Sequence, residues 1–414
     1  MNKYVSRKAV LSFWSPEISA FGFWIAVVVV SLCLVLAGIV GLICAITFEV
    51  MFAVLGDVRK DFSLDVESME DMLLKQKCKA AVRHYVQKVT VSLAGTHFLC
   101  HVHILSVSHQ NDAAPTVLLL HGNASSAFCF AELFDELSEK FNILAVDIPG
   151  FGRSTSARPP KHQTSDFYAK FISALLVQMS LKKVYVIGHS FGGFVASLFA
   201  AQSPQSVTRL LLIDPAGIFP TLGATGAYWA VFFKWSLLQS HRNFGKVGTW
   251  MFSVFCHARR WGLEARYWYA VSGARDSWGD RVMAEYISLS WSRAYWLEPM
   301  LPALLDARIP IATAYGRHDC IMPPHQGKAL QDIFGWPTRV LEDSGHVLLG
   351  GKDTSVLAEY VNEFFKDGQC EKTAGRKSID KEALLCFQAS FSAAESLSSI
   401  KELYEYLGEK TKVY

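Results

Sequence analysis

The sequence has little net charge, no paired cysteines and no internal repeats, and each absence narrows what the protein can be. Its formal net charge is only +3 over 414 residues, without a basic cluster, so nucleic acid is not expected as a partner. Its nine cysteines form neither a Cys-x-x-Cys pair nor a Cys/His zinc spacing, which argues against a disulfide framework and a structural metal. We expect one large domain with additions, and neither a metal nor an organic cofactor.

A long stretch near the N-terminus lacks charged side chains altogether. Asp, Glu, Lys and Arg are all missing between Glu17 and Glu49. The run exceeds the ~20 apolar residues that cross a bilayer, and it is about twice the ~7–15 residues typical of a cleaved signal sequence. The sequence therefore predicts a short basic segment at 1–19, a transmembrane helix at 20–48 and a single-pass membrane protein. The basic residues before this helix slightly favour a large domain on the lumenal or extracytoplasmic side.

The remainder divides into four parts by composition. Residues 49–83 are polar and of mixed charge, which is typical of a juxtamembrane linker or helix. Residues 84–367 alternate short apolar runs with helical patterns, which indicates an α/β domain with a mostly parallel sheet flanked by helices. Within this domain, about 215–308 reads as a helical cap insertion. Residues 368–414 form a polar tail, partly helical.

The apolar runs have the length and composition of buried strands, and an alternating pair opens the domain as a hairpin. The expected strands are 85–93, 98–107, 117–120, 143–146, 184–187, 210–213, 311–315 and 338–341.

The predicted cap is rich in tryptophan. These aromatic side chains either join the cap helices to one another or line an apolar substrate cavity. The tryptophans in this segment are Trp229, Trp235, Trp250, Trp261, Trp268, Trp278, Trp291 and Trp296.

The pentapeptide Gly188-His189-Ser190-Phe191-Gly192 carries the clearest chemical signal. It follows an apolar strand-like run and precedes a helical pattern, as a G-x-S-x-G nucleophile elbow requires. A serine hydroxyl is a weak nucleophile, so it needs a base, an acid that orients the base, and N–H donors for the oxyanion. We predict Ser190 as the nucleophile.

The oxyanion donors are expected on two loops. His121-Gly122-Asn123 directly follows the strand at 117–120, where this type of fold supplies one backbone N–H, and the residue after the nucleophile supplies the other. We therefore predict the N–H groups of Asn123 and Phe191 as donors. His121 is interpreted as a structural histidine.

The base and the acid come from later strand ends. His346 follows the last strand in a Ser-Gly-His loop and is the predicted base. Asp319 lies in a turn shaped by Gly and Pro and is the preferred acid, with Asp214 as the alternative, because catalytic groups of open α/β sheets gather at strand ends. Asp147, in a Pro- and Gly-rich loop, is interpreted as structural.

These motifs together resemble the α/β-hydrolase superfamily, in the branch with a helical cap after the sixth strand. The resemblance extends from about residue 84 to 367 and implies a nucleophilic Ser190, a basic His346, an acidic Asp319, and Asn123 and Phe191 at the oxyanion. A serine at the elbow argues against dehalogenase and epoxide-hydrolase relatives, which use Asp there. The motifs are LLLHGNASS, VDIPGFGRS, VIGHSFGG, LLIDPAG, YGRHDCIMPP and DSGHVLL.

The N-terminal span and aromatic cap are similar to those of membrane-bound acylglycerol lipases. We expect cleavage of a carboxylic ester through an acyl-enzyme, with a lipid or acylglycerol ester as the preferred substrate class. The alternatives are a small soluble ester or thioester, a peptide such as a proline-iminopeptidase substrate, acyl transfer, and a non-catalytic, membrane-tethered binding protein. The oligomeric state is not predicted.

Overall fold

The computed structural model describes most of the predicted α/β domain, within a compact unit that begins at Val66. The predicted transmembrane helix, nearly all of the cap and the C-terminal tail lie outside the described residues. Of the helices in this part of the chain, none combines the length and apolar character needed to cross a bilayer. The described residues are 66–111, 113–122, 125–156, 165–217, 267, 301–319, 322–346 and 353–366.

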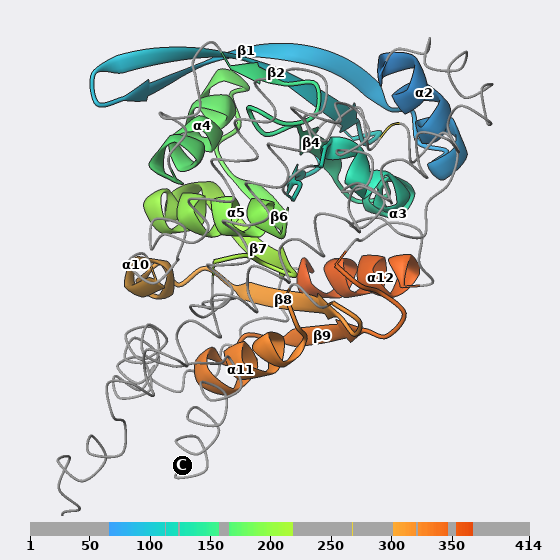
Figure 1. Ribbon diagram of the computed structural model, residues 1–414, viewed down its shortest axis with the longest axis vertical. Coiled ribbons are helices and arrows are strands. Elements are labelled where there is room, and N and C mark those ends of the chain that lie inside the picture. Colours follow the sequence, from blue (N-terminus) through green and yellow to red (C-terminus); the bar gives the residue numbers. More distant parts are fainter. Residues whose placement is uncertain are drawn as a thin grey trace, which may run out of the picture. The chain divides into compact units, whose positions relative to one another are not determined.

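A nine-stranded mixed sheet forms the centre of this unit (Figure 1). The strands are β1 (Arg83–Leu93), β2 (Thr96–Val107), β3 (Thr116–Leu120), β4 (Asn142–Val146), β5 (Thr155–Ser156), β6 (Val184–His189), β7 (Val207–Ile213), β8 (Ile311–Gly316) and β9 (Thr338–Leu341).

The strand order is β1-β2-β4-β3-β6-β7-β8-β9, with the short β5 paired to β2. The β1–β2 and β2–β4 pairs are antiparallel, and every pair from β4 to β9 is parallel. The chain passes from β3 to β4 on one side and later returns to β6 on the other. Such a reversal opens a crevice beyond the carboxyl ends of the two strands, where open α/β sheets bind ligands.

The predicted opening hairpin is confirmed. Leu93 pairs with Thr96, so the connection is the two-residue loop Ala94-Gly95. Both loop residues have positive φ angles, 47° and 76°, as a type I′ turn requires, and this turn matches the right-handed twist of the flanking strands.

Helices cover both faces of the sheet (Figure 1). One apolar core lies beneath α4, α5, α10 and α11, and a second lies beneath α2, η2, α3 and α12. The helices are α2 (Val66–Lys77), η2 (Ala127–Leu133), α3 (Phe134–Ser138), α4 (Ser165–Gln178), α5 (Phe191–Gln202), η4 (Pro204–Ser206), α10 (Leu301–Asp306), α11 (His325–Phe334) and α12 (Thr354–Phe364).

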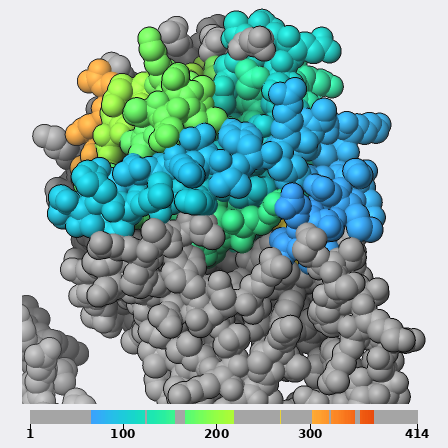
Figure 2. Space-filling model, turned by 90° about the horizontal axis from the view of Figure 1, so that it is seen from above, coloured from blue at the N-terminus to red at the C-terminus, as the bar shows by residue number. Residues whose placement is uncertain are grey.

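The folded unit extends further toward the N-terminus than the predicted boundary at residue 84. Helix α2 buries Val66, Met69, Leu73 and Leu74 in the second core. This spacing places the four side chains on one face of the helix. Figure 2 shows α2 and the β1–β2 hairpin as a continuous blue and cyan band across one face of the molecule. Part of the segment interpreted as a juxtamembrane linker is therefore a component of the domain.

Candidate active site

Ser190 occupies a strained turn between β6 and α5. Its backbone angles are φ 51° and ψ −117°, a combination that costs an L-residue of order 1–3 kcal/mol and persists only where the surroundings hold it. Its carbonyl oxygen accepts hydrogen bonds from the N–H groups of Gly193, Phe194 and Ala216 at 2.9, 3.2 and 3.0 Å. These bonds hold the turn in place, and it has the shape of a nucleophile elbow.

The two glycines of the pentapeptide are required by close packing. A Cβ on Gly192 would lie 2.0 Å from the backbone oxygen of Leu120, and one on Gly188 would lie 2.5 Å from the oxygen of Gly192. Both distances are far below van der Waals contact. The absence of side chains lets the end of β3 approach the elbow, so the loop after β3 lies against Ser190.

The structure brings the three predicted residues of the triad together. His346 Nε2 lies 2.9 Å from Ser190 Oγ, and His346 Nδ1 lies 2.6 Å from Asp319 Oδ2. The other carboxylate oxygen of Asp319 accepts the N–H of Met322 at 2.9 Å. Ser190 and Asp319 are buried. An imidazole that bridges a hydroxyl and a carboxylate in this way is arranged to take the hydroxyl proton.

Asp214, the alternative acid, is a buried neighbour of Asp319. Its Oδ1 accepts the N–H of Gly316 at 2.9 Å, and its side chain also interacts with the carboxyl group of Asp319. Complete burial and the nearby charge of Asp319 raise the pKa of Asp214 well above its ordinary value. The geometry therefore favours Asp319 as the acid that contacts His346.

One of the two predicted oxyanion donors can be placed. Phe191 is the first residue of α5 and directly follows Ser190, which is the position that supplies one oxyanion N–H in this type of fold. Gly122 faces the nucleophile, since a Cβ on Gly122 would lie 3.1 Å from Ser190 Cβ. Asn123, the second predicted donor, lies outside the described residues.

Comparison with known proteins identifies the fold family. The family described as the alpha/beta hydrolase fold matches residues 115–353, more than half of the chain. The chain belongs to the α/β hydrolase fold family.

Curated relatives of this chain include two plant proteins. A probable 1-acylglycerol-3-phosphate O-acyltransferase of Oryza sativa subsp. japonica is 27% identical over 51% of this chain and 57% of its own length. The 1-acylglycerol-3-phosphate O-acyltransferase of Arabidopsis thaliana is 33% identical over 50% of this chain and 56% of its own. The chain thus spans a little over half the length of these relatives.

Solved structures share the fold. Naproxen esterase, a carboxylesterase of Bacillus subtilis, superimposes with a TM-score of 0.52 at 20% identity, over 73% of this chain and 99% of the esterase. At this level of identity the likeness establishes the α/β hydrolase fold and leaves the substrate open.

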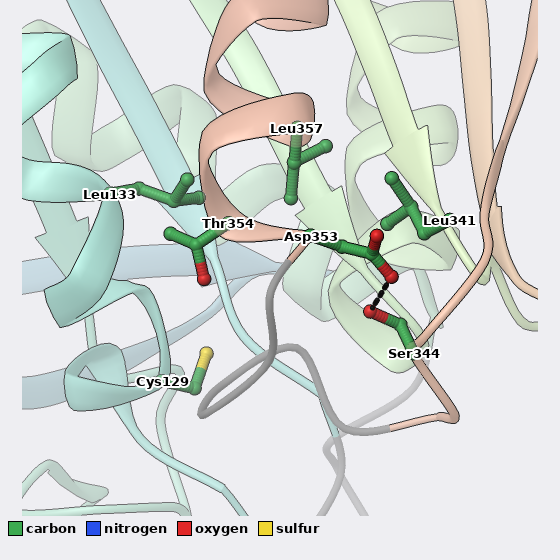
Figure 3. Close-up of a pocket in the computed structure, with 7 residues that line it drawn as sticks. All are labelled: Cys129, Leu133, Leu341, Ser344, Asp353, Thr354 and Leu357. Atoms are coloured by element: carbon green, nitrogen blue, oxygen red, sulfur yellow. Dashed lines mark hydrogen bonds between the residues drawn. The ribbon is translucent and has the colours of Figure 1, made fainter.

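Hydrogen bonds from neighbouring loops hold the loop that carries His346. Asp353 accepts hydrogen bonds from Ser344 Oγ at 2.8 Å and from the N–H of Asp343 at 2.7 Å. Figure 3 shows the Ser344–Asp353 bond at the edge of a small cavity of about 10 Å³, which is room for about one water molecule. The N–H of His318 donates to the carbonyl oxygen of Ser344 at 2.9 Å, so the acid loop and the histidine loop hold each other.

His189, which sequence reasoning left without a role, contacts the histidine loop directly. Its Nε2–H donates to the carbonyl oxygen of His346 at 2.7 Å. Burial and the neighbouring His346 lower the pKa of His189 to about 3, so the ring stays neutral with its one proton on Nε2. The sequence offered no signal for this contact, because it joins residues 157 positions apart.

The two residues interpreted as structural make backbone contacts. His121 Nδ1 donates to the oxygen of Gly122 at 2.7 Å, and its Nε2 accepts the N–H of Ile148 at 2.9 Å. Asp147 accepts the N–H groups of Ala127 at 2.6 Å and Arg153 at 2.7 Å. Burial alone would raise the pKa of Asp147, but the hydrogen bond and charge of His103 lower it.

Two groups of side chains in the described part of the chain have the spacing of metal ligands. In the first, His189, Asp214 and His346 lie together, but His346 is already committed to Ser190 and Asp319. The second comprises Glu70, His84 and His103. There the Arg153 guanidinium lies 3.0 Å from Glu70 Oε2 and 3.2 Å from His84 Nδ1. Because that cation occupies the position a metal would need, we assign no metal to either group.

Proposed function

We propose that the protein is a membrane-anchored serine hydrolase that cleaves the carboxylic esters of lipids through an acyl-enzyme. The observation that carries the proposal is the continuous contact from Ser190 through His346 to Asp319, at 2.9 and 2.6 Å. These distances lie within the range over which a general base accepts a proton and a carboxylate orients it.

The geometry supports an acyl-transfer sequence. As Ser190 Oγ attacks the ester carbonyl carbon, its proton passes to His346 Nε2, and Asp319 stabilises the resulting imidazolium. The carbonyl oxygen becomes an oxyanion held by the N–H of Phe191 and, as predicted from the sequence, that of Asn123. The ester C–O bond then breaks, and the leaving alcohol takes the proton from His346. Water repeats the attack, which releases the fatty acid and restores Ser190.

The choice of a lipid substrate rests on three supports. The predicted transmembrane helix at 20–48 would hold the active site beside a bilayer, and the predicted cap supplies aromatic residues for an apolar acyl chain. The two plant relatives are named for the acylation of a glycerolipid. We propose an acylglycerol or lysophospholipid ester as the substrate class, with the catalytic domain on the lumenal or extracytoplasmic side.

A second candidate is acyl transfer at the same serine. The names of both plant relatives describe O-acyltransferases, and an alcohol in place of water would carry the acyl group from Ser190 to a new ester. The first half of the reaction is identical in the two cases. They differ only in whether the deacylating oxygen belongs to water or to a lipid hydroxyl.

An activity-based probe tests the proposal on the detergent-solubilised full chain. A fluorophosphonate should label the wild type and the Ser197→Ala variant equally, and Ser190→Ala not at all. Ser197 is a matched control because it is buried in the same helix and donates to the oxygen of Gly193. Labelling of Ser190→Ala at the wild-type level would overturn the assignment. Incubation with a monoacylglycerol, with and without lysophosphatidic acid as an acceptor, then separates release of free fatty acid from transfer.

A further inference from the structure

A fully buried carboxylate, Glu70, lies at an apolar position of α2. The helix turns its apolar face to the core through Val66, Met69, Leu73 and Leu74, and Glu70 shares that face with 0% exposure. A buried carboxylate requires strong hydrogen-bond partners to offset its lost hydration. Its partners lie in segments remote from α2 in the sequence. Two series of hydrogen bonds, called the first and the second route below, connect these partners to residues near the nucleophile.

The first route passes through Tyr267, which belongs to the predicted cap. The Tyr267 hydroxyl donates to Glu70 Oε1, so its remaining role toward Ser126 Oγ, 2.7 Å away, is that of acceptor. Burial and the charges of Glu70 and Asp147 raise the pKa of Tyr267 well above its ordinary value, which keeps this donor protonated. The ring also packs edge-on against Phe128, with centroids 4.9 Å apart.

The second route passes through Arg153. Its guanidinium donates to Glu70 Oε2 at 3.0 Å, and its backbone N–H donates to Asp147 Oδ2 at 2.7 Å. The other oxygen of Asp147 accepts the N–H of Ala127 at 2.6 Å. His103 Nδ1 lies within hydrogen-bond distance, 2.9 Å, of Asp147 Oδ2.

Both routes end at adjacent residues, Ser126 and Ala127. These residues lie four and five positions after Gly122, which faces Ser190. At the other end of the same segment, His121 accepts the N–H of Ile148. The loop after β3 is thus held at both ends, and its later end depends on hydrogen bonds that lead back to Glu70.

Glu70 precedes residue 115, where the match to the hydrolase family begins. We propose that Glu70 is a positioning residue which, through Tyr267 and Ser126, holds the oxyanion loop after β3 in place against Ser190. This role rests on the proposed function of the site. It makes α2 and Tyr267 contributors to the reaction rate.

Four variants of the full chain test this role. Glu70→Ala removes both routes, Tyr267→Phe removes only the first, and Glu70→Gln keeps an acceptor for the tyrosine. Glu67→Gln is the matched control, because Glu67 lies on the same helix and pairs with Arg153 at 2.7 Å but is 64% exposed. Melting temperatures identify any variant that fails to fold, and Tyr267→Phe, which loses a single oxygen, keeps the test valid if Glu70→Ala is unfolded.

The kinetic readout is the rate of fluorophosphonate labelling together with kcat and KM for a short-chain ester. We expect Glu70→Ala and Tyr267→Phe to lower the labelling rate and kcat about 10- to 100-fold, a smaller loss than the ~10²–10³ that follows removal of an oxyanion donor. KM should change little, since the loop acts on the transition state. Glu70→Gln should recover most of the rate, and Glu67→Gln should match the wild type.

Hydrogen exchange of the peptide 121–130 provides a readout independent of activity. Exchange should be faster in Glu70→Ala and Tyr267→Phe than in the wild type and Glu67→Gln. Wild-type labelling rates in both variants, with Ser190 still the labelled residue, would overturn the positioning role and leave the proposed function intact. Absence of Ser190-dependent labelling in the wild type would overturn the proposed function. In that case, faster exchange would retain the loop-holding role and unchanged exchange would remove it too.

Discussion

Replacing Asp319 by asparagine separates the two candidate acids. The amide keeps the size of the side chain but removes the charge that holds the His346 ring with Nδ1 protonated, across a contact of 2.6 Å. The asparagine NH₂ group would favour the opposite tautomer, with the proton on Nε2, where it cannot accept from Ser190. In serine proteases the equivalent exchange lowers kcat by ~10⁴, which corresponds to about 5 kcal/mol of transition-state stabilisation. We expect a loss of that order.

Asp214→Asn is the matched comparison, and it should have a small effect. Burial and the charge of Asp319 raise the pKa of Asp214 well above its ordinary value. Because this shift favours the neutral form of the carboxyl group, an amide of equal size should disturb the electrostatics less here than at Asp319. Its Oδ1 contact with the N–H of Gly316 at 2.9 Å is retained by the amide oxygen. We expect kcat to fall by less than about 3-fold, within the ~0.6 kcal/mol of a neutral exchange.

The double variant gives a further outcome. Loss of the Asp319 charge removes one cause of the raised pKa of Asp214, so Asp214 ionises more readily in Asp319→Asn. A carboxylate oxygen of Asp214 lies within 4.8 Å of a ring nitrogen of His346, close enough to supply part of the missing charge. The double variant should therefore be less active than Asp319→Asn alone.

The assay is single-turnover acylation by p-nitrophenyl butyrate, with the Ser190→Ala variant as background. Acylation is measured alone so that release of the product does not mask the chemical step. An Asp214→Asn loss as large as that of Asp319→Asn would contradict the assignment of Asp319, because it would make Asp214 the acid that orients His346.

Three further predictions concern stability and His189. Because the pKa of Asp214 is raised in the folded state, the carboxyl group loses its proton more easily in the unfolded state, and Asp214 destabilises the fold increasingly as the pH rises above its unfolded pKa. In urea unfolding, Asp214→Asn should therefore be more stable than the wild type at about pH 7 but not at about pH 3. An equal difference in stability at both pH values would contradict the raised pKa. Gly192→Ala should lower the free energy of unfolding by about 3 kcal/mol or more, because the added Cβ would lie 2.0 Å from the oxygen of Leu120. Gly335→Ala, at a φ of 70° with open space around its Cβ, should lower it by only about 1–2 kcal/mol. Equal melting temperatures of the two variants would show that close packing at Gly192 is not what requires glycine there. His189→Phe should lower kcat with little change in KM, because the donor to the oxygen of His346 is lost, whereas His189→Gln should retain more activity. NMR of the histidine rings should show that His189 is neutral down to about pH 4, consistent with its pKa of about 3. Titration of His189 near pH 6 would contradict the buried, neutral ring.

Local sequence signals determined most of the framework. The Ala94-Gly95-Thr96 segment and the alternation on either side of it predict the β1–β2 hairpin, because the side-chain period and the turn chemistry are both properties of consecutive residues. The same holds for the Ser190 elbow, whose glycines are needed wherever a strand, a sharp turn and a helix meet. His346 and Asp319 could be proposed because each directly follows a strand-like run, and parallel strands bring such ends to one edge of the sheet.

Only the tertiary structure could decide between Asp319 and Asp214, since both follow predicted strands and the choice depends on a distance to His346. It also decided the environment of Glu70. Glu70 lies in a segment that the sequence indicated only as a juxtamembrane linker or helix, and its partner Tyr267 lies 197 positions away. Hydrophobic periodicity indicates which face of a helix or strand is buried. Which residues contact that face depends on how elements distant in the sequence pack together. The sequence alone therefore determined most of the strands of the sheet and their ends, and packing across the sheet decided which side chains act together.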